Sequence, residues 1–155
     1  MPWELLIKLV EFHLNNHCDM TVGLTSYLTD YTTDVGKIWI NGFTNDIVKC
    51  LGREEYDTNL NKNIIPLTSA GIYIVNSQKF KNMYKTFLED NQNIKETQVE
   101  MRDQLLPWLI GEKIFKVKGF DLRGEILDIG NYERIVYAKK HWKKYTINNQ
   151  ENSPL

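Results

Sequence analysis

Apolar residues recur along this chain with two different spacings, one typical of helices and one typical of strands. Between positions 5 and 13 they return every three or four residues, which predicts an amphipathic helix over about residues 3–16. The continuous apolar run 70–75 predicts a buried strand, and the alternation over 113–118 predicts a half-buried one. Further strands are expected at 19–25, 36–42, 46–51 and 125–129, and further helices at 77–89, 97–110 and 132–144.

Helices and strands therefore alternate along the chain, which indicates an α/β layer structure. A glycine-containing turn joins the strands 36–42 and 46–51, so these two are expected to form a hairpin inserted in that pattern. The polar stretch 52–66 predicts a long loop. A polar tail at 147–155 follows the single domain expected over 1–146.

Composition narrows the class of protein. The chain has 155 residues, 42% of them hydrophobic, which suits one globular domain. Its 19 basic and 20 acidic residues give a net charge of -1, which argues against a nucleic acid or an anionic membrane as partner. Cys18 and Cys50 lack metal-site spacing and are expected to be reduced thiols, and no apolar run is long enough to span a bilayer, so we expect a cytoplasmic protein.

The stretch 119–134 carries the clearest candidate for chemistry. It predicts a short strand that ends in the turn Asp128-Ile129-Gly130 and leads directly into a helix. A carboxylate at the end of a strand, beside a glycine, suits a metal ion or a sugar phosphate. The alternative is that Asp128 caps the helix or completes the turn.

Four segments, taken in order, resemble the second half of the sugar-phosphate nucleotidyltransferases that charge mannose-, heptose- or glucose-1-phosphate. They are the helix and strand 4–22, the hairpin 36–51, the strand Ser69-Ala70-Gly71-Ile72-Tyr73-Ile74-Val75, and a closing block of Leu106-Pro107 with Asp128-Ile129-Gly130, Tyr132 and Ala138. The resemblance covers residues 4–142. It implies the C-terminal portion of a Rossmann-like (GT-A-like) nucleotidyltransferase fold, with a mixed sheet flanked by helices.

Members of that family join a nucleoside triphosphate to a sugar 1-phosphate and release pyrophosphate. The resemblance implies that Mg²⁺ is the cofactor and that Asp128 is one of its two carboxylate ligands. It also implies that the sugar approaches the strand backbone at Gly71, beside Ser69, which stands where the family usually has Asn. The family's Glu-Lys pair aligns with Gly52-Arg53, so the glutamate is lost and Arg53 is left to meet the phosphate.

Each of these positions also has a plainer interpretation. Gly71 could be a tightly packed strand glycine, and Arg53 could be an ordinary surface arginine. The acidic residues that the family often has near Pro107 could be Glu100 or Asp103, in a register that the sequence leaves open. His13 and His17 lie four apart on a helix, which can bind a metal but is more often a surface feature.

The nucleotide-binding half of the family has no counterpart here. None of the nine glycines forms a phosphate-binding loop, so we expect a truncated chain that is inactive alone. We also expect the strands at 19–25 and 71–75 to lack pairing partners, which would expose apolar sheet edges and helix faces. The partners expected are a sugar 1-phosphate and either a separate N-terminal half or a full-length relative. The alternative to a split enzyme is a non-catalytic sugar-phosphate-binding or interaction module.

Overall fold

The computed structural model describes residues 3–26, 37–51, 63–112, 114–123, 132–133 and 135–140. The predicted strand 125–129 and the polar tail 147–155 lie outside the described residues, as do most of the loop 52–66 and part of the last helix. Residues 132–133 and 135–140 are helical, as predicted for that helix.

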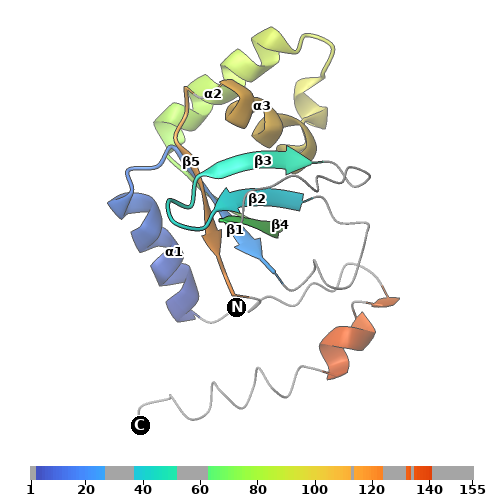
Figure 1. Cartoon of the computed structure of the whole chain (residues 1–155). Coiled ribbons are helices and arrows are strands. Elements are labelled where there is room, and N and C mark those ends of the chain that lie inside the picture. The colour runs from blue at the N-terminus through green and yellow to red at the C-terminus, as the bar shows by residue number, and fades with distance from the viewer. Residues whose placement is uncertain are drawn as a thin grey trace.

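Five strands form one mixed sheet, and helices cover it (Figure 1). In chain order the strands are β1 Met20–Thr25, β2 Lys37–Asn41, β3 Ile47–Leu51, β4 Ile64–Val75 and β5 Val117–Asp121. Their order in the sheet is β3-β2-β4-β1-β5; β1 and β5 are parallel, and the other neighbours are antiparallel. The predicted α/β class and the hairpin of β2 and β3 are therefore confirmed.

The helices lie on different sides of the sheet. α1 (Trp3–Asn15) lies beside β1, and the His13 side chain on this helix forms a hydrogen bond with the Thr21 side chain of that strand. The neighbouring side chain Val22 points the opposite way because side chains alternate along a strand. Val22 belongs to a buried cluster with Phe87 of α2 (Ser77–Asp90) and Leu109 of α3 (Leu106–Glu112). Figure 1 shows α1 beside β1 and β5, with α2 and α3 at the other end of the sheet.

Local sequence signals explain the start and the buried face of α2. Asn76 is its N-cap, and the Asn76 side chain accepts a hydrogen bond from the backbone N–H of Lys79 (3.1 Å). Met83 and Phe87 are buried, while Phe80 and Tyr84 pack half-buried against the same core. The aromatic face of this helix is therefore core, as its spacing predicts.

The expectation that β1 and β4 lack pairing partners is wrong. β1 lies between β4 and β5, and β4 lies between β2 and β1, so both strands are interior. The strands at the ends of the row are β3 and β5, and they approach each other because Asp46 forms an isolated bridge with Lys118. The sheet therefore curls until the β2–β3 turn meets β5. The expected exposed helix face does occur, since α1 presents four exposed apolar side chains: Trp3, Ile7, Val10 and Leu14.

Three predicted boundaries are also corrected. The end of the loop 52–66 is strand, because Ile64 and Ile65 extend β4 along β2. Pro66 is tolerated there because β1 pairs with β4 only from Thr68 onward, so no β1 residue faces its missing N–H. The strand predicted at 113–118 begins instead at Val117 and runs to Asp121, where it pairs with β1.

The helix predicted at 97–110 is divided into three pieces. They are a 3₁₀ turn at Glu96–Gln98, a π-helical turn at Met101–Leu105, and α3 at Leu106–Glu112. Pro107 is the second residue of α3, directly after the π-helical turn, and it has no N–H to donate to the carbonyl groups of that turn. Among the described helices, none has the length and hydropathy needed to cross a membrane.

Candidate functional site

Ser69 and Asp121 lie on one row across the sheet, at the carboxyl ends of the two parallel strands. Leu24 of β1 is the register partner of Ser69 on β4 and also of Asp121 on β5. Ser69 and Asp121 are therefore two strand spacings apart, roughly 10 Å. β5 ends at Asp121, the described segment continues to Arg123, and Asp128 lies outside the described residues. In α/β proteins, ligands bind at the carboxyl ends of parallel strands, which makes this edge the candidate site.

β4 is bulged at Gly71. Gly23 pairs with Ile72 while the next β1 residue, Leu24, pairs with Ser69, so Ala70 and Gly71 have no opposite residue on β1. Gly71 has a φ of +74°, a conformation that favours glycine. No heavy atom of the described residues lies within 4 Å of the position that a Cβ would occupy. Gly71 is therefore exposed, and its backbone conformation favours glycine over other residues. The alternative of a tightly packed strand glycine is wrong.

The bulge is held by the side chain of Ser69. Its hydroxyl oxygen accepts a hydrogen bond from the Gly71 N–H (3.2 Å) and shares another with the hydroxyl of Tyr73 (2.9 Å). Both side chains are partly buried. Two hydroxyl groups and an open strand backbone thus lie together, which is the arrangement that a polar ligand such as a sugar can use.

Arg102 is a charged group near this pair that the sequence interpretation missed. The Arg102 side chain is about one quarter exposed and forms two hydrogen bonds with the carboxylate of Asp103, from Nε (2.5 Å) and from Nη2 (2.7 Å). The hydrogen bond with Asp103 raises the pKa of the Arg102 guanidinium, and charge interactions with Tyr73 and Glu100 act in the same direction. The only signal in the sequence was the polar segment before Pro107, because the π-helical turn that carries Arg102 has no periodicity to find.

Arg53 and Asp128, the predicted phosphate-binding and metal-binding residues, lie outside the described residues. At this edge the described carboxylate is Asp121, whose Oδ1 accepts a hydrogen bond from the backbone N–H of Arg123 (2.7 Å). The described part of the chain contains no group of three or more His, Cys, Asp and Glu side chains that could hold a metal ion. One oxygen of the Asp121 carboxylate thus already accepts a hydrogen bond.

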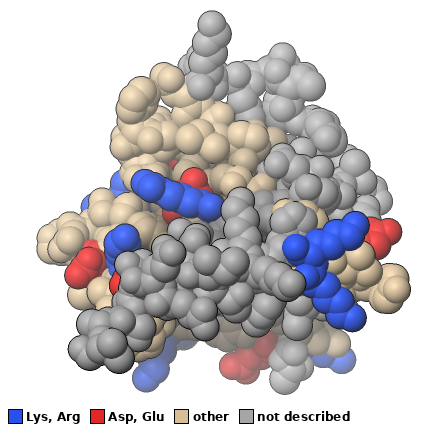
Figure 2. All heavy atoms as spheres, turned by 90° about the horizontal axis from the view of Figure 1, so that it is seen from below, with Lys and Arg blue, Asp and Glu red and all other residues tan. Residues whose placement is uncertain are grey.

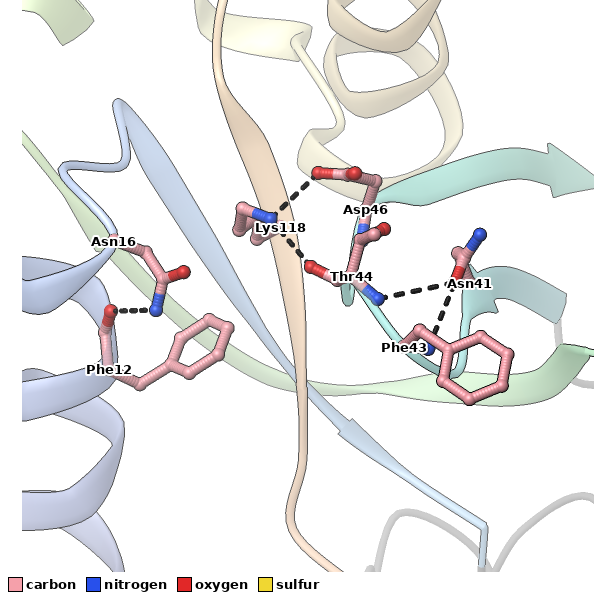
Figure 3. A network of polar contacts seen from close by, with 7 residues as sticks. All are labelled: Phe12, Asn16, Asn41, Phe43, Thr44, Asp46 and Lys118. Atoms are coloured by element: carbon pink, nitrogen blue, oxygen red, sulfur yellow. Dashed lines mark hydrogen bonds and ion pairs between the residues drawn. The ribbon is translucent and has the colours of Figure 1, made fainter.

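A buried lysine near the start of β5 fixes the β2–β3 turn against that strand (Figure 3). The ammonium group of Lys118 donates to the backbone oxygen of Thr44 (2.5 Å) and pairs with Asp46 Oδ1 (2.9 Å). Partial burial by itself would raise the pKa of the Asp46 carboxyl, but hydrogen bonds with Thr44 and Lys118 and the nearby positive charges hold it below its usual value. Lys118 therefore joins the β2–β3 turn to β5 through both of these contacts.

Cys50 is not a reactive thiol. Burial, with a smaller contribution from the charge of Asp103, raises the pKa of the Cys50 thiol to about 12. The thiol is therefore neutral near pH 7, and a neutral thiol is a poor nucleophile and metal ligand. Both cysteines are free, as the sequence predicted.

His13 is a buried residue, not a surface residue. The ring is buried, and its Nδ1 is 2.9 Å from the hydroxyl oxygen of Thr21. Desolvation by burial lowers the pKa of His13 below its ordinary value, and the negative charge of Asp19 opposes this only in part.

This burial predicts a loss of stability in mildly acidic solution. The unfolded chain takes up a proton at His13 near the ordinary pKa of 6.5, whereas the folded protein resists it until a lower pH. Neutral His13 therefore contributes fully to stability above a pH of about 6.5. This contribution is lost as the pH falls from there toward the lower pKa of His13 in the folded protein. Urea unfolding between pH 7.5 and 5.5 should show a steeper fall in the midpoint for the natural chain than for His13→Gln. Equal slopes for the two proteins would contradict the assignment.

Figure 2 looks onto the face toward which β1 and β5 point. Lys and Arg side chains lie in several separate places on this face, with Asp and Glu side chains between them. The described residues therefore show no single basic patch on this face.

Comparison of the chain with protein-family models and with curated proteins finds no match.

Proposed function

We propose that this chain is the sugar-phosphate-binding portion of a nucleotidyltransferase-like protein of nucleotide-sugar biosynthesis. Its fold would be the C-terminal part of a Rossmann-like, GT-A-like domain, and its place would be the cytoplasm. The observation that carries the proposal is the open bulge at Gly71. It lies beside the hydroxyl of Ser69, on the same row of the sheet as the end of β5.

In this proposal the ligand is a sugar 1-phosphate, and the described residues hold its sugar ring. Hydroxyl groups of the sugar would hydrogen-bond to Ser69, to Tyr73 and to the exposed backbone at Gly71, which has room for them because it lacks a side chain. Arg53 and Asp128 would hold the phosphate and Mg²⁺, and the cation would neutralise the charge on the phosphate oxygens.

In the complete reaction an oxygen of the sugar phosphate attacks the α-phosphorus of a nucleoside triphosphate, and pyrophosphate leaves with the electrons of the broken P–O bond. The triphosphate would be bound by a separate N-terminal half or by a full-length relative, since this chain contains no glycine-rich phosphate loop. The exposed apolar side chains on α1 are a surface that such a partner would cover. We therefore expect no pyrophosphate release from this chain alone and restored turnover when the missing half is supplied.

Replacing Gly71 tests the binding site directly. Gly71→Val would force a β-branched residue into a positive-φ conformation and place its side chain where the sugar is proposed to lie. Calorimetry with mannose-, heptose- and glucose-1-phosphate, each with and without Mg²⁺, should show saturable binding to the natural chain. We expect that affinity to fall at least about tenfold in Gly71→Val, which corresponds to roughly 1.4 kcal/mol.

Ser69→Ala provides a milder variant, because it removes one hydroxyl group and leaves the backbone conformation of the bulge to the glycine. Gly111→Ala serves as the matched control, because Gly111 also has open space around it but lies in α3 without a positive φ. Unchanged affinity in Gly71→Val, with the protein still folded, would rule out this position as the sugar site. No heat with any of the three phosphates would rule out the proposed function.

A further inference from the structure

A cavity lies on the α1 side of the sheet and contains neither Ser69 nor Tyr73. It has a volume of about 400 Å³ and is bounded by α1, by the β2–β3 turn and by the end of β5. Pockets for small organic ligands occupy roughly 300 to 1,000 Å³. All the residues that line it belong to the described part of the chain.

The inner wall of this cavity is largely apolar and aromatic. Phe12 of α1 and Phe120 of β5 both line it, with ring centroids 5.2 Å apart and ring planes inclined by 60°. Both rings are only partly buried, so each still presents aromatic surface. Flat rings pack favourably against such a pair in offset or edge-on arrangements.

The rim carries two cations that have no partner within the described residues. Lys8 and Arg123 are exposed, and neither side chain forms a hydrogen bond or an ion pair with the rest of the described chain. Asp121 also lines the cavity, with its Oδ1 engaged by the backbone N–H of Arg123. The side-chain amide of Asn45 completes the polar groups. Two cations and one carboxylate leave a net charge of +1 around an apolar wall.

We propose that this cavity binds a small aromatic anion, with its flat ring against Phe12 and Phe120 and its anionic group between Lys8 and Arg123. The anionic group could be a carboxylate or a phosphate, because an ammonium and a guanidinium bind either one. The Asn45 amide and the free oxygen of Asp121 then meet polar atoms on the edge of the ring. This site shares Asp121 with the edge described above but no residue with the Ser69–Gly71 bulge, and its anion-binding residues, Lys8 and Arg123, have no part in the proposed function.

The test titrates two aromatic anions into the full chain by calorimetry. Indole-3-acetate carries a carboxylate, and adenosine 5′-monophosphate carries a phosphate. We expect saturable binding of at least one of them; the stronger probe identifies a carboxylate or a phosphate as the anion. Lys8→Gln and Arg123→Gln should each weaken it roughly tenfold, the value of one charge-assisted hydrogen bond. The neutral ring of 3-methylindole should bind more weakly than indole-3-acetate.

Both substituted side chains are exposed, so the variants are expected to fold. Lys85→Gln is the control, since Lys85 is exposed on α2 and its ion pair with Glu89 (3.6 Å) lies outside the cavity. Failure of both probes to bind would overturn the proposal. Binding that is equally strong in Lys8→Gln, Arg123→Gln and Lys85→Gln would also overturn it, because the cations would then have no role. Gly71→Val should bind these probes like the natural chain, which separates this site from the proposed sugar site.

Discussion

Replacing Gly119 with valine should lower the free energy of unfolding by about 3 kcal/mol, the upper part of the range for overpacked cores. Gly119 is buried on β5, and a Cβ there would overlap Leu24 Cδ1 and would lie 2.7 Å from Ile40 Cγ2. Its backbone N–H also donates to the carbonyl oxygen of Asn45 (2.9 Å), the contact that brings the β2–β3 turn to β5. A side chain at this position would therefore separate β5 from the turn as well as crowd the core.

Urea unfolding monitored by tryptophan fluorescence measures this effect. Gly111→Ala is the paired control, because open space surrounds Gly111 in α3 and alanine favours a helix over glycine by up to about 1 kcal/mol. We expect its stability to be unchanged or slightly higher. If the free energy of unfolding of Gly119→Val lies within about 0.5 kcal/mol of that of the natural chain, the core can rearrange around the new side chain. That result would contradict the close packing of Gly119 against Leu24 and Ile40.

Replacing Asp19 with alanine should lower the free energy of unfolding by about 2 to 3 kcal/mol, because hydrogen bonds to a charged group are lost together. Asp19 is buried where three elements meet. Its Oδ1 pairs with the ammonium group of Lys79 at the start of α2, and its Oδ2 accepts from the backbone N–H of Lys116 just before β5 (2.9 Å). Its own carbonyl oxygen accepts from the N–H of Asn76 (3.0 Å). The alanine variant would leave the Lys116 N–H without its acceptor.

Two milder variants separate the contribution of the ion pair from that of the Lys116 hydrogen bond. Asp19→Asn keeps an acceptor for Lys116 and loses the ion pair, and Lys79→Met removes the ion pair from the other side. The Lys79 side chain is 56% exposed, so solvent weakens the pair, and we expect each variant to cost only about 1 kcal/mol. Equal losses for Asp19→Ala and Lys79→Met in urea unfolding would contradict the larger role given to the Lys116 hydrogen bond.

Two of the five described residues of the candidate site could be found from the sequence. Ser69 and Gly71 were identified because glycine in an apolar strand marks a bulge or a close approach, and because their strand resembles a family motif. Tyr73, Arg102 and Asp121 were not. Tyr73 contacts Ser69 across the bulge and Asp121 shares a row with Ser69 only through the sheet, while Arg102 lies on the π-helical turn. No spacing along the chain reveals that Leu24 has Ser69 on one side and Asp121 on the other.

The sequence by itself determined the elements whose signals are local. The helix α1, the strand β1, the hairpin of β2 and β3, and the capped start of α2 follow from periodicity, turn residues and Asn76, which act within a few residues of one another. Only the tertiary structure decided where β5 begins, which strands surround β1, and that His13 is buried. These depend on pairing between residues far apart in the chain, and the backbone of a strand pairs with whichever neighbour the packed core brings to it.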